Sequence, residues 1–339
     1  MELYSAESWE YSRNYASLLG EIPSSFTSTI RALLLDTEKN NNTLSNGSKY
    51  LASRLVKSSS MKAPFYYATS SYKPELLEGR DSITDDELVK GYKPDEIATL
   101  FGIIYLYKKA KKYCDPGEFA FIAPTMHKEL NVAGQVGLSI RGIGFSAGLL
   151  TYGMRYIGAA TFLKHNVKHF QEYRRLFKNQ KNIFNLQKEL EYFGCTIPQI
   201  ASIFLQTLGY GITYANNFAM ALSSETQLTK TFVDSSPFKV TELWTDTLNE
   251  TGKEPQIIHD SKFYPMNTAI LSNLAAKAAA APLNWLDKTS DDISPELTPL
   301  IAKNKAAGAD PLKTGEDVPA GVSEEIATQI DADLKKLDE

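Results

Sequence analysis

The sequence predicts an all-α protein with an extended C-terminal tail. Apolar residues recur at helical spacing, most clearly in the stripe along residues 156–178. Helix boundaries carry the residues that usually mark them. Pro94 and the acids behind it begin a segment that we expect to stay helical to Tyr113, and glycines end the apolar segment 198–208. Residues 230–244, rich in Thr, Phe and Val, are weakly strand-like.

The first part of the chain is expected to alternate helices with connections. Apolar spacing predicts a helix at 26–34, and the Asn-rich segment 36–48 predicts a loop. A short helix is expected at 50–56. The aromatic, proline-containing segment 64–81 is expected to be a long connection, and another helix is expected at 118–130.

The middle of the chain is rich in glycine. Seven glycines lie in the apolar region between residues 134 and 158, and this density indicates helices or loops that approach closely. Further helices are expected at 188–193 and at 266–281, the second of which is closed by Pro282.

Charge is distributed unevenly along the chain. The apolar fraction of 43% and the net charge of −4 are ordinary for a globular protein, but residues 287–339 hold 13 acids and 6 lysines, which leaves the body at +3. We expect a helical domain at 1–225, a helical extension packed on it at 226–288, a proline-containing linker at 289–321 and an amphipathic helix at 322–339.

The predicted last helix has an apolar face. Ser323 is placed to cap it, and Ile326, Ile330, Leu334 and Leu337 lie on one side. We therefore expect the helix to dock, either on the basic surface of the body or on a partner.

The sequence also bears on location. No run approaches the roughly 18 apolar residues of a membrane span. The first ten residues lack the basic and apolar regions of a signal peptide. Cys114 and Cys195 lie far apart and without metal-ligand spacing, which favours free thiols. These features predict a cytoplasmic protein without membrane association.

A series of apolar, glycine and glutamate positions carries a family resemblance. Residues 145–150 read Phe-Ser-Ala-Gly-Leu-Leu and are followed by Ile157-Gly158; Glu191 precedes Phe193-Gly194, and a helix at 197–209 ends in Leu-Gly. This order resembles the HDOD family, the HD-related output domains of bacterial signalling proteins. The resemblance implies an HD-like helical bundle.

The resemblance extends more weakly over residues 20–225, through Ile22-Pro23 and the run 54–61. Where related phosphohydrolases carry a His-Asp pair, this chain has Thr151 and Tyr152. A hydroxyl and a phenol do not ordinarily hold a divalent cation. The resemblance therefore implies a pseudoenzyme, with no metal, no cofactor and no phosphohydrolase activity, in a family generally regarded as non-catalytic adaptors.

Basic residues gather on and before the helix predicted at 156–178. Such a surface suits a phosphate-bearing ligand, a nucleic acid or a protein, but it also suits a solvated helix face or a dock for the acidic tail. The expected anion or partner patch comprises Arg155, Lys164, His165, Lys168, His169, Arg174, Arg175 and Lys178.

Other chemistry-bearing residues have a simpler interpretation. His165 and His169 are four apart on one predicted helix but lack further ligands, so we expect helix-packing or surface histidines. His127 is expected to be partly buried, and His259-Asp260 is interpreted as a chance dipeptide. Ser146 has the Gly-x-Ser-x-Gly spacing of a nucleophile elbow without its strand.

The preferred hypothesis is a non-catalytic signalling adaptor or regulatory scaffold with a protein partner. The alternative is an effector-binding module that holds a nucleotide or another anionic ligand in the former active-site cavity, near Tyr152 and Arg155. A second alternative, ranked lower because the body is only +3, is nucleic-acid binding through the basic helix.

Overall fold

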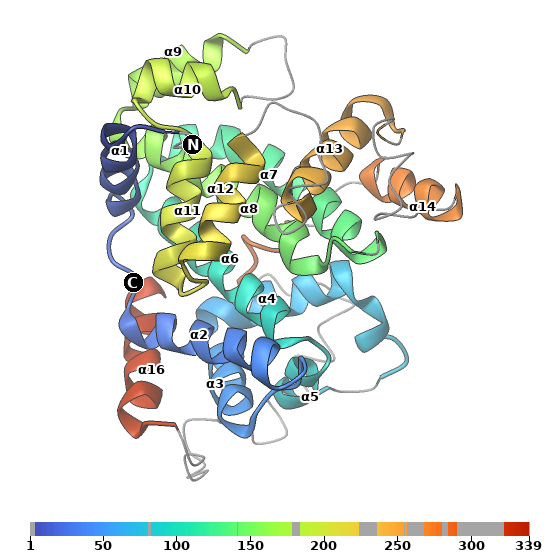
Figure 1. Cartoon of the computed structure of the whole chain (residues 1–339). Coiled ribbons are helices and arrows are strands. Elements are labelled where there is room, and N and C mark those ends of the chain that lie inside the picture. The colour runs from blue at the N-terminus through green and yellow to red at the C-terminus, as the bar shows by residue number, and fades with distance from the viewer. Residues whose placement is uncertain are drawn as a thin grey trace. The chain divides into compact units, whose positions relative to one another are not determined.

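Every regular element that the structure describes is a helix. The computed structural model describes residues 4–80, 83–140, 142–177, 184–223, 236–253, 255, 268–279, 284–289 and 322–338, and no strand occurs in these ranges (Figure 1). The predicted all-α class is confirmed. None of the described helices combines the length and the apolar character that crossing a bilayer requires.

The chain divides into two compact units. Unit 1 comprises Met1–Glu21 and Leu106–Pro282, and unit 2 comprises Ile22–Tyr105 and Leu283–Glu339. The division does not follow the expected boundaries at 225 and 288, because the segment 1–225 contributes to both units. The linker expected at 289–321 lies, apart from Thr289, outside the described residues.

Unit 1 is built around one buried helix, α8. All residues from Phe145 to Leu163 are buried, and α8 packs against α1, α7, α9, α11 and α13. Besides the end of α6 (Pro94–Tyr113), the helices of this unit are α1 (Ala6–Ser17), α7 (Pro116–Ser139), α8 (Phe145–His165), α9 (Val167–Arg175), α10 (Leu186–Phe193), α11 (Ile197–Leu208), α12 (Ile212–Ser223), α13 (Ser236–Thr251) and α14 (Thr268–Ala279).

The glycines of the middle region let α7 and α8 approach each other closely. A Cβ atom on Gly148 would lie 2.4 Å from the carbonyl oxygen of Ala133 and 3.1 Å from the Cα atom of Gly137. The clash would be with backbone, which cannot rotate away. The expected close approach at these glycines is therefore confirmed.

The continuous helix expected at 156–178 is wrong, because the chain breaks at Asn166. This residue is extended, and its side-chain oxygen accepts a hydrogen bond of 3.1 Å from the backbone N–H of His169. Asn166 thus caps α9 and satisfies a donor that a continuous helix would have satisfied internally. His165 consequently ends α8, whereas His169 lies in the first turn of α9.

The weak strand expected at 230–244 is also wrong over its described part, which belongs to α13. Val240, Trp244 and Leu248 repeat every four residues and are buried. Burial of this stripe outweighs the local strand preference of the Thr and Val residues, since intrinsic propensities are worth less than 1 kcal/mol per residue.

Two predicted connections are largely helical. Half of the segment 64–81 belongs to α4 (Ser59–Tyr72), which contains Pro64 and buries the aromatic run Phe65–Tyr67. The loop expected at 36–48 is shortened from both sides by its neighbouring helices. The remaining elements of unit 2 are α2 (Ser24–Lys39), α3 (Asn46–Lys57), the 3-10 helix η1 (Pro74–Leu76), α5 (Asp85–Lys90), most of α6, and α16 (Glu324–Asp338).

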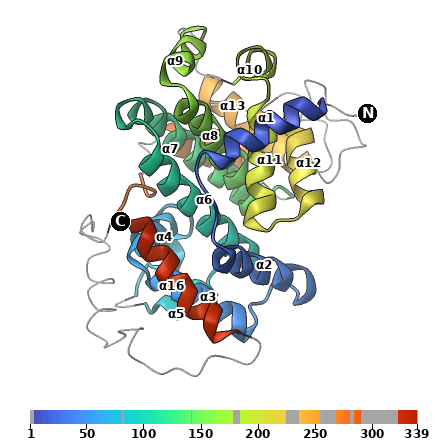
Figure 2. The ribbon, with the colours of Figure 1, turned by 90° about the vertical axis from the view of Figure 1, so that its left-hand side faces the viewer.

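The C-terminal helix α16 docks within unit 2, against α2, α3 and α4 (Figure 2). Ile330 and Leu334 are buried, and Arg54 on α3 forms an ion pair with Asp331. Ser25 on α2 donates a hydrogen bond of 2.7 Å to Asp333. The tail helix therefore docks, as expected, and within its unit it covers a surface of its own chain.

Leu334→Asp is expected to release α16 from unit 2. The substitution places a charge in an apolar contact, where the loss of hydration is costly. Hydrogen–deuterium exchange should show fast exchange across residues 324–338 and new exposure in α2–α4. Thr328→Asp, on the exposed side of the same helix, is the control and should exchange like the natural chain. Equal protection in both variants would contradict this docking.

Candidate functional site

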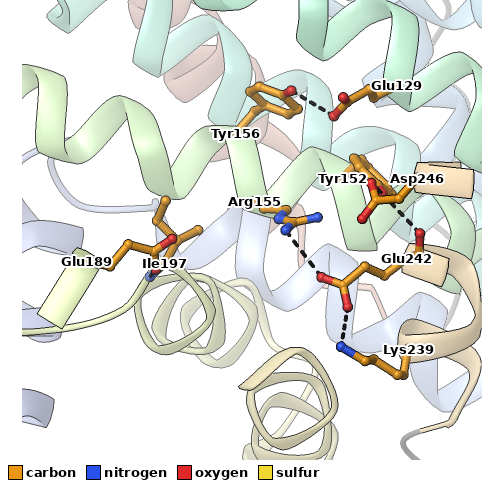
Figure 3. Close-up of polar contacts among 9 residues, drawn as sticks. All are labelled: Glu129, Tyr152, Arg155, Tyr156, Glu189, Ile197, Lys239, Glu242 and Asp246. Atoms are coloured by element: carbon orange, nitrogen blue, oxygen red, sulfur yellow. Dashed lines mark hydrogen bonds and ion pairs between the residues drawn. The ribbon is translucent and has the colours of Figure 1, made fainter. Parts of the chain in front are cut away.

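The two residues at the expected His-Asp positions are part of the core. Thr151 and Tyr152 are both fully buried in α8. The Thr151 hydroxyl donates to the carbonyl oxygen of Ala147 at 2.7 Å, and the Tyr152 hydroxyl donates to Oδ1 of Asp246 on α13 at 2.5 Å (Figure 3). The Thr151 hydroxyl is therefore engaged within α8, and the Tyr152 hydroxyl links α8 to α13.

Arg155, one turn further along α8, is a buried cation. It is 8% exposed, and its Nη2 lies 3.2 Å from Oε1 of Glu242 on α13. The other oxygen of Glu242 lies 2.5 Å from Nζ of Lys239, so one carboxylate bridges two cations (Figure 3). The ring of Phe184 lies 4.1 Å from the guanidinium carbon. Nη1 of Arg155 is buried and has no hydrogen-bond partner among the described residues.

Three further carboxyl groups surround this pair. Glu129 on α7 accepts a hydrogen bond of 2.7 Å from Tyr156, and Glu189 on α10 accepts one of 2.7 Å from the backbone N–H of Ile197. Burial raises the pKa of each of these two glutamates to about 7. Burial also raises the pKa of Asp246, although the positive charge of Arg155 opposes that shift.

A cavity of about 320 Å³ opens among these groups. It is lined by Arg155 from α8, by Glu189 from α10, and by Lys239, Glu242 and Asp246 from α13. The volume falls at the lower end of the range of small-molecule sites, ~300–1,000 Å³. Every lining residue belongs to unit 1, so the site is built from one unit.

The expected basic patch is divided by the break at Asn166. Lys164, His165 and Lys168 are exposed, as is Arg175. Arg174 lies 3.5 Å from Glu118 and packs on the exposed ring of Phe121, whereas Arg155 is buried in the cluster described above. Lys178 lies outside the described residues. The eight residues therefore do not share one surface.

His165 and His169 lie on different helices and make separate packing contacts. The His165 ring packs on Tyr15, and Nε2 of His169 lies 2.8 Å from the carbonyl oxygen of Tyr192. In the described ranges, no three His, Cys, Asp or Glu side chains are grouped to hold a metal ion. His127 is buried against the hydroxyl group of Tyr107, and His259-Asp260 lies outside the description.

The other sequence candidates have structural positions. Ser146 lies in the first turn of α8, and the preceding element is α7 rather than the strand of a nucleophile elbow. Cys114 and Cys195 are free and buried, and burial raises the pKa of the Cys114 thiol to about 12. Neither thiol is therefore an activated nucleophile.

Sequence reasoning missed the partners of Arg155. Lys239, Glu242 and Asp246 lie in or beside the segment expected to be strand-like, so their common face was not recognised. Their spacing of three and four residues is the signal that a helical assignment would have used. Glu129 carried no local signal, because its partner is Tyr156 on another helix.

No family model, no curated protein and no solved structure matches this chain. The resemblance to the HDOD family consequently stays a prediction, based on the residues around Gly148-Leu149-Leu150.

Unfolding free energy is expected to decrease as the pH rises from about 5 to about 7. The folded-state pKa of Glu189 lies above its ordinary value of 4.5, so the folded chain binds more protons in this window. The stabilisation is complete below the pKa of Glu189 in the unfolded chain. It is lost as the pH rises through the pKa of Glu189 in the folded chain. A shift to about 7 corresponds to roughly 3 kcal/mol as an upper bound.

Chemical denaturation at several pH values tests this expectation. Glu189→Gln keeps an acceptor for Ile197 and should remove about half of the dependence, because Glu129 still titrates. Glu172→Gln, an exposed control on α9, should behave like the natural chain. A flat profile in the natural chain, or an unchanged slope in Glu189→Gln, would contradict the burial of this carboxyl group.

Proposed function

We propose that this chain is a non-catalytic regulatory scaffold, related to the HDOD adaptors, that acts in the cytoplasm through a protein partner. The single observation that carries the proposal is the position of Thr151 and Tyr152. Both residues are fully buried, and their hydroxyl groups bond within the core of unit 1. Of the two positions that would hold a metal in a related phosphohydrolase, Tyr152 bonds to Asp246 on α13, and Thr151 bonds within α8.

Two further features agree with this proposal. The free thiols of Cys114 and Cys195 suit a reducing compartment. The helix α16 docks on its own unit through Ile330 and Leu334, a partly exposed ion pair of Asp331 and a hydrogen bond from Ser25 to Asp333. Such a helix suits a scaffold whose surfaces are covered and uncovered by partners.

The cavity beside Arg155 favours a second candidate, an effector-binding module. The observation in its favour is that Arg155, a residue lining the cavity, has a buried nitrogen atom that lacks a partner among the described residues. Nucleic-acid binding has weaker support, since Arg155 is buried away from the patch and Arg174 lies near Glu118.

The purified chain is expected to show no hydrolysis of p-nitrophenyl phosphate or bis-p-nitrophenyl phosphate with Mg²⁺, Mn²⁺, Fe²⁺ or Zn²⁺. Elemental analysis of the same preparation should show no stoichiometric metal. Thr151→Ala is the matched variant, because it removes the hydroxyl group bonded to Ala147 together with only one methyl group. Turnover together with stoichiometric metal would overturn the proposal, and loss of that turnover in Thr151→Ala would locate the activity at this position.

A further inference from the structure

The cavity of unit 1 contains a buried donor without an acceptor. Nη1 of Arg155 makes no hydrogen bond with the described residues, although the side chain is more than nine-tenths buried and lines the cavity. Leaving a buried charged donor unpaired is costly, because the desolvation of the N–H group is not offset. A ligand atom that accepts a hydrogen bond would remove that cost.

A second cation lies on the same wall. Nζ of Lys239 lies 2.5 Å from Oε2 of Glu242, and 19% of the Lys239 side chain is exposed. An ammonium group has three donors, so contact with one carboxylate oxygen leaves others for a ligand. Arg155 and Lys239 together favour a ligand that carries a carboxylate.

An acid on the cavity wall complements these cations. Asp246 lines the cavity, and among the described residues only Tyr152 donates a hydrogen bond to it. A carboxylate has about four acceptor positions, so Asp246 has capacity for a further donor. An ammonium group on the ligand would meet this requirement.

The balance of charge argues against a nucleotide. The cavity is lined by three carboxyl groups, those of Glu189, Glu242 and Asp246, besides the two cations. A phosphate chain would therefore bring several negative charges close to these carboxyl groups. A ligand without net charge avoids this repulsion. The volume of about 320 Å³ also favours a small molecule.

We propose that this cavity binds a small zwitterion of the amino-acid class. Its carboxylate accepts a hydrogen bond from Nη1 of Arg155 in the field of Lys239, and its ammonium group donates to Asp246. The site goes beyond the proposed scaffold function and does not depend on it, because a ligand site of this kind needs no particular partner and no catalysis.

Titration calorimetry and thermal unfolding with the twenty protein amino acids test the proposal on the full chain. At least one amino acid is expected to bind and to raise Tm. The matched acid without the amino group, and the matched amine without the carboxylate, should each bind about tenfold or more weakly, as expected for loss of one charged hydrogen bond. ATP and other nucleotides should bind more weakly than the amino acid.

Variants locate the site. Lys239→Gln and Asp246→Asn should each weaken binding about tenfold or more. Asparagine can still accept the Tyr152 hydrogen bond, so the second variant is expected to fold. Lys188→Gln, on a partly exposed lysine of α10, is the matched control and should bind like the natural chain. Arg155→Lys tests the guanidinium directly, and the other two variants serve if it does not fold.

Three results would overturn the proposal. The first is that no amino acid binds, or that nucleotides bind more tightly. The second is that the deaminated acid binds as tightly as the amino acid. The third is that binding is unchanged in both Lys239→Gln and Asp246→Asn. None of these results would indicate a metal site at Thr151 and Tyr152. The scaffold proposal is tested separately, by the hydrolysis assay and the metal analysis.

Discussion

The burial of the Arg155 charge is the constraint on which the rest of unit 1 depends. Removing a guanidinium from water costs several kcal/mol unless a nearby charge and hydrogen bonds compensate it. Here the compensation comes from α13, which places Glu242 3.2 Å from Nη2 and Asp246 nearby. Because α13 supplies this negative charge, the cation on α8 can be buried. The same ion pair fixes the orientation of α13 against α8.

The same constraint accounts for the neighbouring residues. Tyr152, one turn before Arg155, bonds to Asp246, so the phenol that occupies an expected His-Asp position also orients an acid of the cluster. Glu129 and Glu189 are buried where Arg155 offsets only part of their desolvation, so the pKa of each rises to about 7. The cluster thus contains the buried ion pair, the tyrosine that packs beside it and two glutamates with raised pKa values.

The sequence predicted the features that depend on local chemistry. Pro94 marks the first residue of α6, and the glycines near Gly148 allow the close packing of α7 and α8. Two features escaped prediction. The side chain of Asn166 ends one helix by capping the next, a local signal that the apolar stripe along 156–178 concealed. Burial of the Trp244 stripe, a non-local effect, makes a strand-like segment helical. Of the candidate site, the sequence indicated only Arg155 and Tyr152, because their partners come from distant segments.

A double-mutant cycle on Arg155→Met and Glu242→Met tests the central claim most directly, with the free energy of unfolding as the measurement. Glu242→Met removes the carboxylate that pairs with the buried Arg155 and should lose roughly 3–5 kcal/mol. Arg155→Met leaves Glu242 paired with Lys239 and should lose less, and the double variant should lose less than the sum of the two. The exposed pair Lys188 and Glu191 should show no comparable coupling. Small, additive losses at Arg155 and Glu242 would contradict the account, because they would mean that the charge of Arg155 does not hold α8 and α13 together.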